Sequence, residues 1–210
     1  GNLVLTFKIH FMKKILHVIS SPRGEDSFSI KLGNAIVEKI VEVYPGSVVK
    51  VNNLADNKFP HLWDEQIVSF FTPPEYRTDE NIQAIQLSDQ AIEEILEADI
   101  LVIGVPFYNF GIHSTLKAWI DHISRAGVTF RFTETGYEGL IHGKKAYLAI
   151  ASGGIYSEGM MQSFDFAGPY LKAILGFLRI TDVTIVRVEG TAIPDLKDHV
   201  LEKPINGFVS

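Results

Sequence analysis

Short apolar runs alternate with amphipathic segments along most of the chain. Five runs have the length and composition of buried parallel strands, and they cover residues 15–19, 48–54, 100–106, 146–150 and 183–188. Between them, apolar residues recur every three or four positions, which predicts helices over residues 28–43, 81–97 and 164–178. A further helix is expected to end near Ile123 and to have its N-cap at Ser114 or Thr115.

Strand and helix therefore alternate five times. This order predicts a single α/β domain with a doubly wound, five-stranded parallel sheet, helices on both faces and right-handed crossovers. Residues 127–139 alternate weakly and are rich in aromatics, so we expect an aromatic hairpin that departs from the sheet. Residues 55–80 are irregular. We place the domain at residues 12–192, between an N-terminal extension (1–11) and a C-terminal tail (193–210).

Composition narrows the class of protein. The chain has 210 residues and no cysteine, which excludes disulfides, thiolate metal sites and a Cys nucleophile and is compatible with a cytoplasmic location. A net charge of -6 argues against nucleic acid as a partner. No apolar run reaches the ~18 residues that span a membrane, and residues 3–7 lack the flanks of a signal peptide. We interpret Gly1 as an expression remnant and Met12 as a candidate natural start.

The loop after the first strand has the features of a phosphate site. It contains Ser21, Ser27 and Ser29 and opens a helix, whose unpaired N–H groups favour an anion. It matches neither the dinucleotide fingerprint nor the P-loop, and this fits a mononucleotide phosphate better than an NTP. The alternative is that Ser27 or Ser29 only caps the helix. Glu25 and Asp26 suit an anion site only if they face solvent.

Two further strand-end loops suit a flat ring. Phe107, Tyr108 and Phe110 follow the third strand, either to lie along a heteroaromatic ligand or to pack under a helix. Gly153 and Gly154 follow the fourth strand, where they allow close approach to a ligand or simply a tight turn. Because strand-end loops of parallel sheets converge on one crevice, the three loops together predict an FMN site with a phosphate end and an aromatic end.

The chain from Lys13 to about Ala192 resembles the FMN-dependent NADH-azoreductase and quinone-reductase family of flavodoxin-like proteins. The residues that carry the resemblance follow one another in order: Ser21 with residues 27–29, residues 107–110, 116–117, 125–130, 143–146, 153–155, 175–177 and 180–183. The chain departs from the family where Ala151 and Ser152 precede the paired glycines, since the family often has Ser-Arg there. It also has Phe107 where the family often has Met.

The resemblance implies roles for individual residues. The FMN phosphate would bind to Ser21, Ser27, Phe28 and Ser29. The isoalloxazine would lie along Phe107, Tyr108, Asn109 and Phe110, and its polar edge would contact Ala151, Ser152, Gly153 and Gly154. The family is similar in being homodimeric with flavin sites at the subunit interface, where Phe132 and Phe177, together with Asn109, would line the substrate pocket.

The expected activity is transfer of two electrons from NADH or NADPH to quinones and azo compounds, by a ping-pong mechanism in one pocket. We name no catalytic acid or base, because the flavin supplies the chemistry. One alternative is a flavodoxin-like electron carrier, and a less favoured one is an acyl carrier protein phosphodiesterase. No metal site is expected: His17 is interpreted as a core residue, and the neighbours Asp121 and His122 do not share a helix face.

Overall fold

The computed structural model describes residues 11–194 and residue 201. The expectations for residues 1–10, and for the tail beyond residue 194 apart from residue 201, lie outside the described residues.

Within the described residues, five parallel strands form one sheet, as predicted from the sequence. Its order is β2-β1-β3-β6-β7. The strands are β1 (Lys14–Ile19), β2 (Val48–Asn53), β3 (Ile100–Pro106), β6 (Lys145–Ala151) and β7 (Asp182–Val188). The chain runs from β1 outward to β2 and then returns to β3 on the other side of β1. The order of the strands therefore reverses between β1 and β3, which is where such sheets bind ligands.

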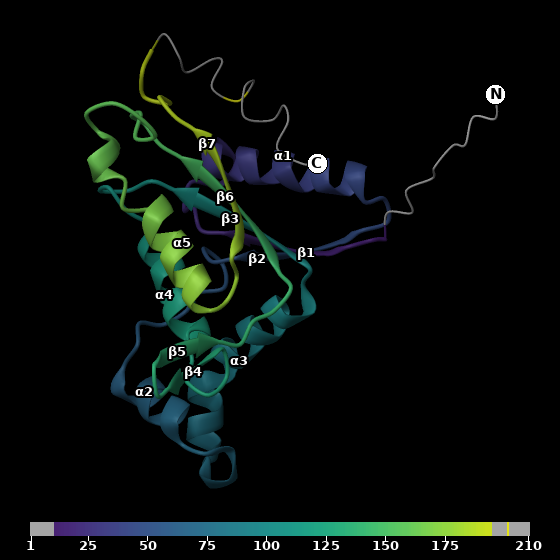
Figure 1. Ribbon diagram of the computed structural model, residues 1–210, viewed down its shortest axis with the longest axis vertical. Coiled ribbons are helices and arrows are strands. Elements are labelled where there is room, and N and C mark those ends of the chain that lie inside the picture. Colours follow the sequence, from purple (N-terminus) through teal and green to yellow (C-terminus); the bar gives the residue numbers. More distant parts are fainter. Residues whose placement is uncertain (1–10, 195–200, 202–210) are drawn as a thin grey trace, which may run out of the picture.

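Helices cover both faces of the sheet (Figure 1). Helix α1 (Phe28–Val43) lies on one face, and α3 (Asp79–Glu97), α4 (Ser114–Ile123) and α5 (Gly168–Phe177) lie on the other. The central strand β3 shows how the sequence divides between the two layers. Val102 packs with the residues of α1, whereas Leu101 and Ile103 pack with those of α3, α4 and α5. Burial on both faces explains why β3 is apolar throughout.

The predicted hairpin is confirmed. Strands β4 (Phe130–Thr133) and β5 (Gly136–Gly139) form an antiparallel pair beside the end of α5. Phe130 turns inward to the core, 4.5 Å from the ring of Phe177, whereas Phe132 and Tyr137 are 75% and 58% exposed. The hairpin therefore leaves two aromatic side chains on the surface.

Three local features differ from the sequence prediction or add to it. Helix α5 begins at Gly168 and not near Phe164, because Asp165 Oδ1 accepts the N–H groups of Ala167 and Gly168 and stops the chain from continuing upstream as a helix. Helix α4 is capped by His113 and not by Ser114 or Thr115. The irregular residues 55–80 contain a short helix, α2 (Asp64–Phe71). The described residues also contain three single 3₁₀ turns: η1 (Gly24–Asp26), η2 (Pro74–Tyr76) and η3 (Gln162–Phe164).

Across the described part of the chain, no helix combines the length and the apolar character that crossing a membrane would take.

Candidate functional site

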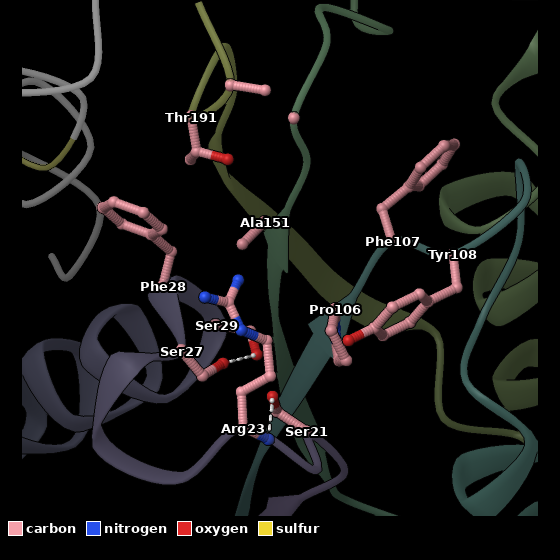
Figure 2. Close-up of a pocket in the computed structure, with 12 residues that line it drawn as sticks. Ser21, Arg23, Ser27, Phe28, Ser29, Pro106, Phe107, Tyr108, Ala151 and Thr191 are labelled. Carbon is pink, nitrogen blue, oxygen red and sulfur yellow. Dashed lines mark hydrogen bonds between the residues drawn. The ribbon is translucent and has the colours of Figure 1, made fainter.

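A cavity of about 320 Å³ lies at the carboxyl ends of β1, β3 and β6, next to the reversal point of the sheet (Figure 2). The serine loop and the aromatic loop predicted from the sequence stand on opposite sides of it, and the glycine loop forms a third side. Its lining residues are Ser21, Arg23, Ser27, Phe28, Ser29, Pro106, Phe107, Tyr108, Ala151, Gly153, Thr191 and Ala192. The structure thus brings together side chains from all three loops.

Three buried serines gather at one end of this cavity. Ser27 Oγ and Ser29 Oγ are 2.9 Å apart, and Ser21 Oγ accepts the N–H of Arg23 at 3.3 Å. Ser27 is the helix cap, since its side chain accepts the N–H of Ile30 at 3.4 Å. As at any helix start, the N–H groups of the first turn of α1 have no intrahelical partner. Hydroxyls and the positive end of the helix dipole therefore face one small space.

Arg23 also lines the serine end, although the sequence interpretation did not include it. Its guanidinium extends past the serine hydroxyls toward the middle of the cavity (Figure 2). Its position in the sequence could have indicated this role, because Arg23 lies in the loop between Ser21 and Ser27, directly before Gly24 of η1. Glu25 and Asp26 are exposed and do not line the cavity. Their negative charges therefore face solvent, as an anion site in this loop requires.

The aromatic loop makes a tight turn at the other end. Tyr108 and Gly111 exchange both backbone hydrogen bonds, at 3.0 and 2.9 Å, and the two residues between them have positive φ: 49° at Asn109 and 66° at Phe110. This is the pattern of a two-residue primed turn, which usually contains glycine or asparagine. Positive φ at a phenylalanine is rare and is found mainly where function maintains it.

The glycine loop is held by short side chains. Ser152 is buried, and its hydroxyl donates to the carbonyl of Gly154 at 2.8 Å. Thr191 donates to the carbonyl of Ser152 through both its N–H and its hydroxyl, each at 3.2 Å. A second cavity of about 320 Å³ extends from this loop and is lined by Phe107, Asn109, Phe110, Gly153, Gly154 and Tyr156. The two cavities share Phe107 and Gly153, so the site is longer than either cavity alone.

A larger cavity of about 810 Å³ lies on the far side of the aromatic loop, against α4 and α5. Tyr108 and Asn109 contribute to it, together with His113, Lys117 and Tyr170. Burial lowers the pKa of His113, and its Nδ1 accepts the N–H of Thr115 at 3.3 Å, so a neutral ring carries its proton on Nε2. Asn109 therefore stands between two cavities that could admit small molecules.

The other predicted residues lie elsewhere. Phe177 ends α5, and Phe132 is on the adjoining hairpin, so both lie near the amino ends of the strands and away from the cavity in the same chain. His17 is in the core as predicted, and burial lowers its pKa to about 4. His122 Nε2 lies 2.9 Å from the carbonyl of Pro60, whereas Asp121 pairs with Lys117. Among the described residues, no three His, Asp or Glu side chains gather as a metal site requires.

Comparisons with known proteins agree with this arrangement. A family whose description is "Flavodoxin-like fold" matches residues 13–208. The FMN-dependent NADH:quinone oxidoreductase of Herminiimonas arsenicoxydans is 47% identical over 182 residues, covering 87% of this chain and 89% of the relative. The protein of the same name from Mesorhizobium japonicum is 42% identical over 190 residues, or 90% of each chain.

Solved structures of two azoreductases have the same fold as this chain over most of its length. An azoreductase from Bacillus anthracis strain Sterne superposes with a TM-score of 0.85 at 32% identity, covering 92% of this chain and 95% of the other. An FMN-dependent NADH-azoreductase from the Ames Ancestor strain, solved in complex with FMN, has a TM-score of 0.82 at 30% identity and covers 92% and 94% of the two chains. This protein therefore belongs to the flavodoxin-like fold family, alongside FMN-dependent NADH:quinone oxidoreductases and azoreductases.

Proposed function

We propose that this protein is an FMN-dependent NADH or NADPH oxidoreductase that passes two electrons to quinones and azo compounds. The observation that carries the proposal is one cavity, at the reversal point of the sheet, with a hydroxyl-lined end and an aromatic end. The names of the relatives supply the reaction class.

The residues present fit FMN. Ser21, Ser27 and Ser29 offer hydroxyl donors to a phosphate, Arg23 adds a positive charge, and the first turn of α1 adds N–H groups. A Cβ at Gly153 would stand 3.2 Å from Ala192, and one at Gly154 would stand 3.2 Å from the Tyr156 ring. A side chain at either glycine would therefore press on Ala192 or Tyr156, which line the two cavities.

FMN, when bound, supplies the hydride chemistry that no protein side chain provides. The chain's own residues bind and orient: the serines and Phe28 hold the phosphate end, and Phe107, Tyr108 and Phe110 exclude water from the ring end. Asn109 offers an exposed carboxamide at the boundary between the ring cavity and the large cavity. We assign no acid or base.

The nicotinamide and the acceptor are proposed to use one pocket in turn, which is a ping-pong mechanism. The sequence contains no second nucleotide-binding fingerprint that would give the dinucleotide a separate site. We propose that Asn109 lines the pocket that the nicotinamide and the acceptor use in turn.

The working unit is proposed to be a cytoplasmic homodimer. Phe132 and Tyr137 are exposed on the hairpin, and a second copy that covers them would remove an apolar patch from water. In a symmetric pair, Phe132 and Phe177 of one copy would face the flavin site of the other.

The purified protein tests the proposal directly. We expect a yellow protein that releases FMN on denaturation and oxidises NADH when a quinone is present. A colourless protein that binds no flavin, or one that needs a separate reductase to accept electrons, would contradict the oxidoreductase assignment and favour another reading of the cavity.

A further inference from the structure

Residues 155–166, which we call the bridging segment, lie across the aromatic loop. The Tyr156 ring is 4.3 Å from the ring of Phe107 and 6.2 Å from that of Phe110. The Phe164 ring is 5.1 Å from that of Phe110, and the N–H of Phe166 donates to the carbonyl of Phe110 at 3.0 Å. The segment thus supports the loop at the two residues that form the aromatic wall of the cavities.

The bridging segment has little regular structure of its own. It contains one 3₁₀ turn, and its tip is turned to solvent, with Met160 95% exposed. Such a segment buries too little apolar surface to fix its own conformation, so what holds it must come from outside.

Two charged residues at the end of β7 hold the segment near its two ends. Glu189 accepts the N–H groups of Tyr156 and Ser157 at 2.9 Å each, and the Ser157 hydroxyl at 2.5 Å. Arg187 Nη2 donates to Asp165 Oδ2 at 2.5 Å. Arg187 is in β7 and Glu189 directly follows the strand. The two side chains lie together, with Arg187 Nη1 3.9 Å from Glu189 Oε1.

These pairs are well shielded from solvent. The exposed fractions of the side chains are 8% for Asp165, 14% for Glu189 and 18% for Arg187. Hydrogen bonds to a charged group with this little exposure are stronger than surface ion pairs. Loss of Arg187 also leaves the charge of Asp165 without its partner. Asp165 also accepts the first N–H groups of α5, so the same carboxylate fixes the end of the segment and the start of a helix.

We propose that Arg187 and Glu189 are positioning residues for the flavin site: they clamp the bridging segment, which in turn fixes the aromatic loop in its strained turn. This inference rests on the proposed function in taking the cavity for a flavin site. Neither side chain lines the cavities at the ring end, so the effect passes through Tyr156 and Phe164.

The inference predicts a specific pattern in flavin affinity. Arg187→Met and Glu189→Ala should weaken FMN and riboflavin by the same factor, about tenfold to a hundredfold, because the ring wall loosens while the phosphate end is untouched. Glu189→Gln keeps an oxygen for the two N–H groups and should restore part of the affinity. Arg187→Lys keeps the charge and should do the same. Lys39→Met, which removes the exposed Lys39–Glu42 pair of α1, is the matched control.

Hydrogen exchange of the full chain without flavin gives a second readout. In Glu189→Ala, the amides of Tyr156 and Ser157, and those of Tyr108 and Gly111 in the aromatic turn, should exchange about tenfold faster or more. Unchanged exchange at Tyr108 and Gly111, or flavin affinities within about twofold of wild type in both variants, would overturn the positioning role. A wild-type chain that binds no flavin would contradict the proposed function instead, while the exchange result would still decide whether the clamp acts on the turn.

Discussion

The side-chain oxygens of Ser27 and Ser29 lie 2.9 Å apart at the start of α1, and the first of them also caps the helix. Ser27 stands just before the helix and caps it through the N–H of Ile30. Ser29 lies within the first turn, buried against the cavity. The capping role that the sequence left open between the two residues therefore belongs to Ser27. Because a hydroxyl that accepts an N–H group can still donate its own hydrogen, we propose both serines for the phosphate, and removal of Ser29 leaves the cap in place.

We predict that Ser29→Ala weakens FMN and spares riboflavin, because only FMN carries the phosphate. A hydrogen bond to a charged group contributes roughly 1.5–3 kcal/mol, which corresponds to about tenfold to a hundredfold in affinity. The measurement is fluorescence titration of the flavin-free protein with each flavin. Ser124→Ala, at the end of α4, is the control and should change neither affinity. Equal losses for both flavins, or no loss, would remove Ser29 from the phosphate site.

His17 should make the protein less stable in acid. Burial lowers its folded pKa from 6.5 to about 4. The unfolded chain therefore takes up a proton at higher pH than the folded chain does. The stability that comes from the neutral ring is fully present above pH 6.5 and is lost as pH falls toward 4. The loss is about 3 kcal/mol, because each unit of pKa difference between the two states corresponds to about 1.36 kcal/mol.

The check is urea unfolding of wild type and His17→Leu across this pH range. The variant changes absolute stability, but its loss of stability between pH 6.5 and 4 should be smaller than that of wild type by about 3 kcal/mol. His142→Gln, at an exposed histidine, should behave as wild type. If His17→Leu and wild type have the same pH dependence, His17 is not held neutral in the fold.

Gly139 should tolerate no side chain. A Cβ there would lie 2.5 Å from backbone atoms of Phe177, Leu178 and Arg179, so Gly139→Ala must displace the hairpin from α5. We expect a loss of about 1–3 kcal/mol or more in the free energy of unfolding. Gly176→Ala is the matched control: nothing lies within 4 Å of its Cβ, and alanine favours the helix by roughly 0.5–1 kcal/mol. Similar thermal unfolding temperatures for the two variants would contradict this packing.

The exposed aromatics of the hairpin should hold a dimer together. Phe132→Ser and Tyr137→Ser remove side chains that are 75% and 58% exposed in the single chain, so they should weaken association with little effect on folding. Light scattering at micromolar concentration measures the association. A wild-type monomer with bound FMN and full activity would show that no second copy completes the site.

Most of the fold could be predicted from the sequence, because the spacing of apolar residues and the length of apolar runs indicate which residues are buried. Successive residues of β3 alternate between the two helix layers, with Ile100 and Val102 on one side and Leu101 and Ile103 on the other. The helix start at Gly168 was missed because the stop comes from Asp165, a tertiary and capping contact with no periodic signal. Phe130 is in the core although the hairpin that carries it departs from the sheet, because its ring packs on that of Phe177.

The site was predicted in outline and not in its supporting parts. The serine, aromatic and glycine loops were found because strand-end loops of a parallel sheet must converge. Arg23 was missed because one arginine in a polar loop does not show which way it points. Arg187 and Glu189 were missed because they act through Tyr156 and Phe164, and that relation exists only once the chain has folded.

The dependence of the reaction on FMN can be measured as NADH-dependent reduction of a simple quinone by protein stripped of flavin, while FMN is added back. We predict no reduction without FMN and a rate that rises to a plateau at one FMN per chain. At the plateau, double-reciprocal plots at several quinone concentrations should be parallel, because one pocket serves both substrates in turn. A rate that does not depend on FMN, or no reduction by protein with FMN fully bound, would contradict the claim; intersecting lines would contradict the shared pocket.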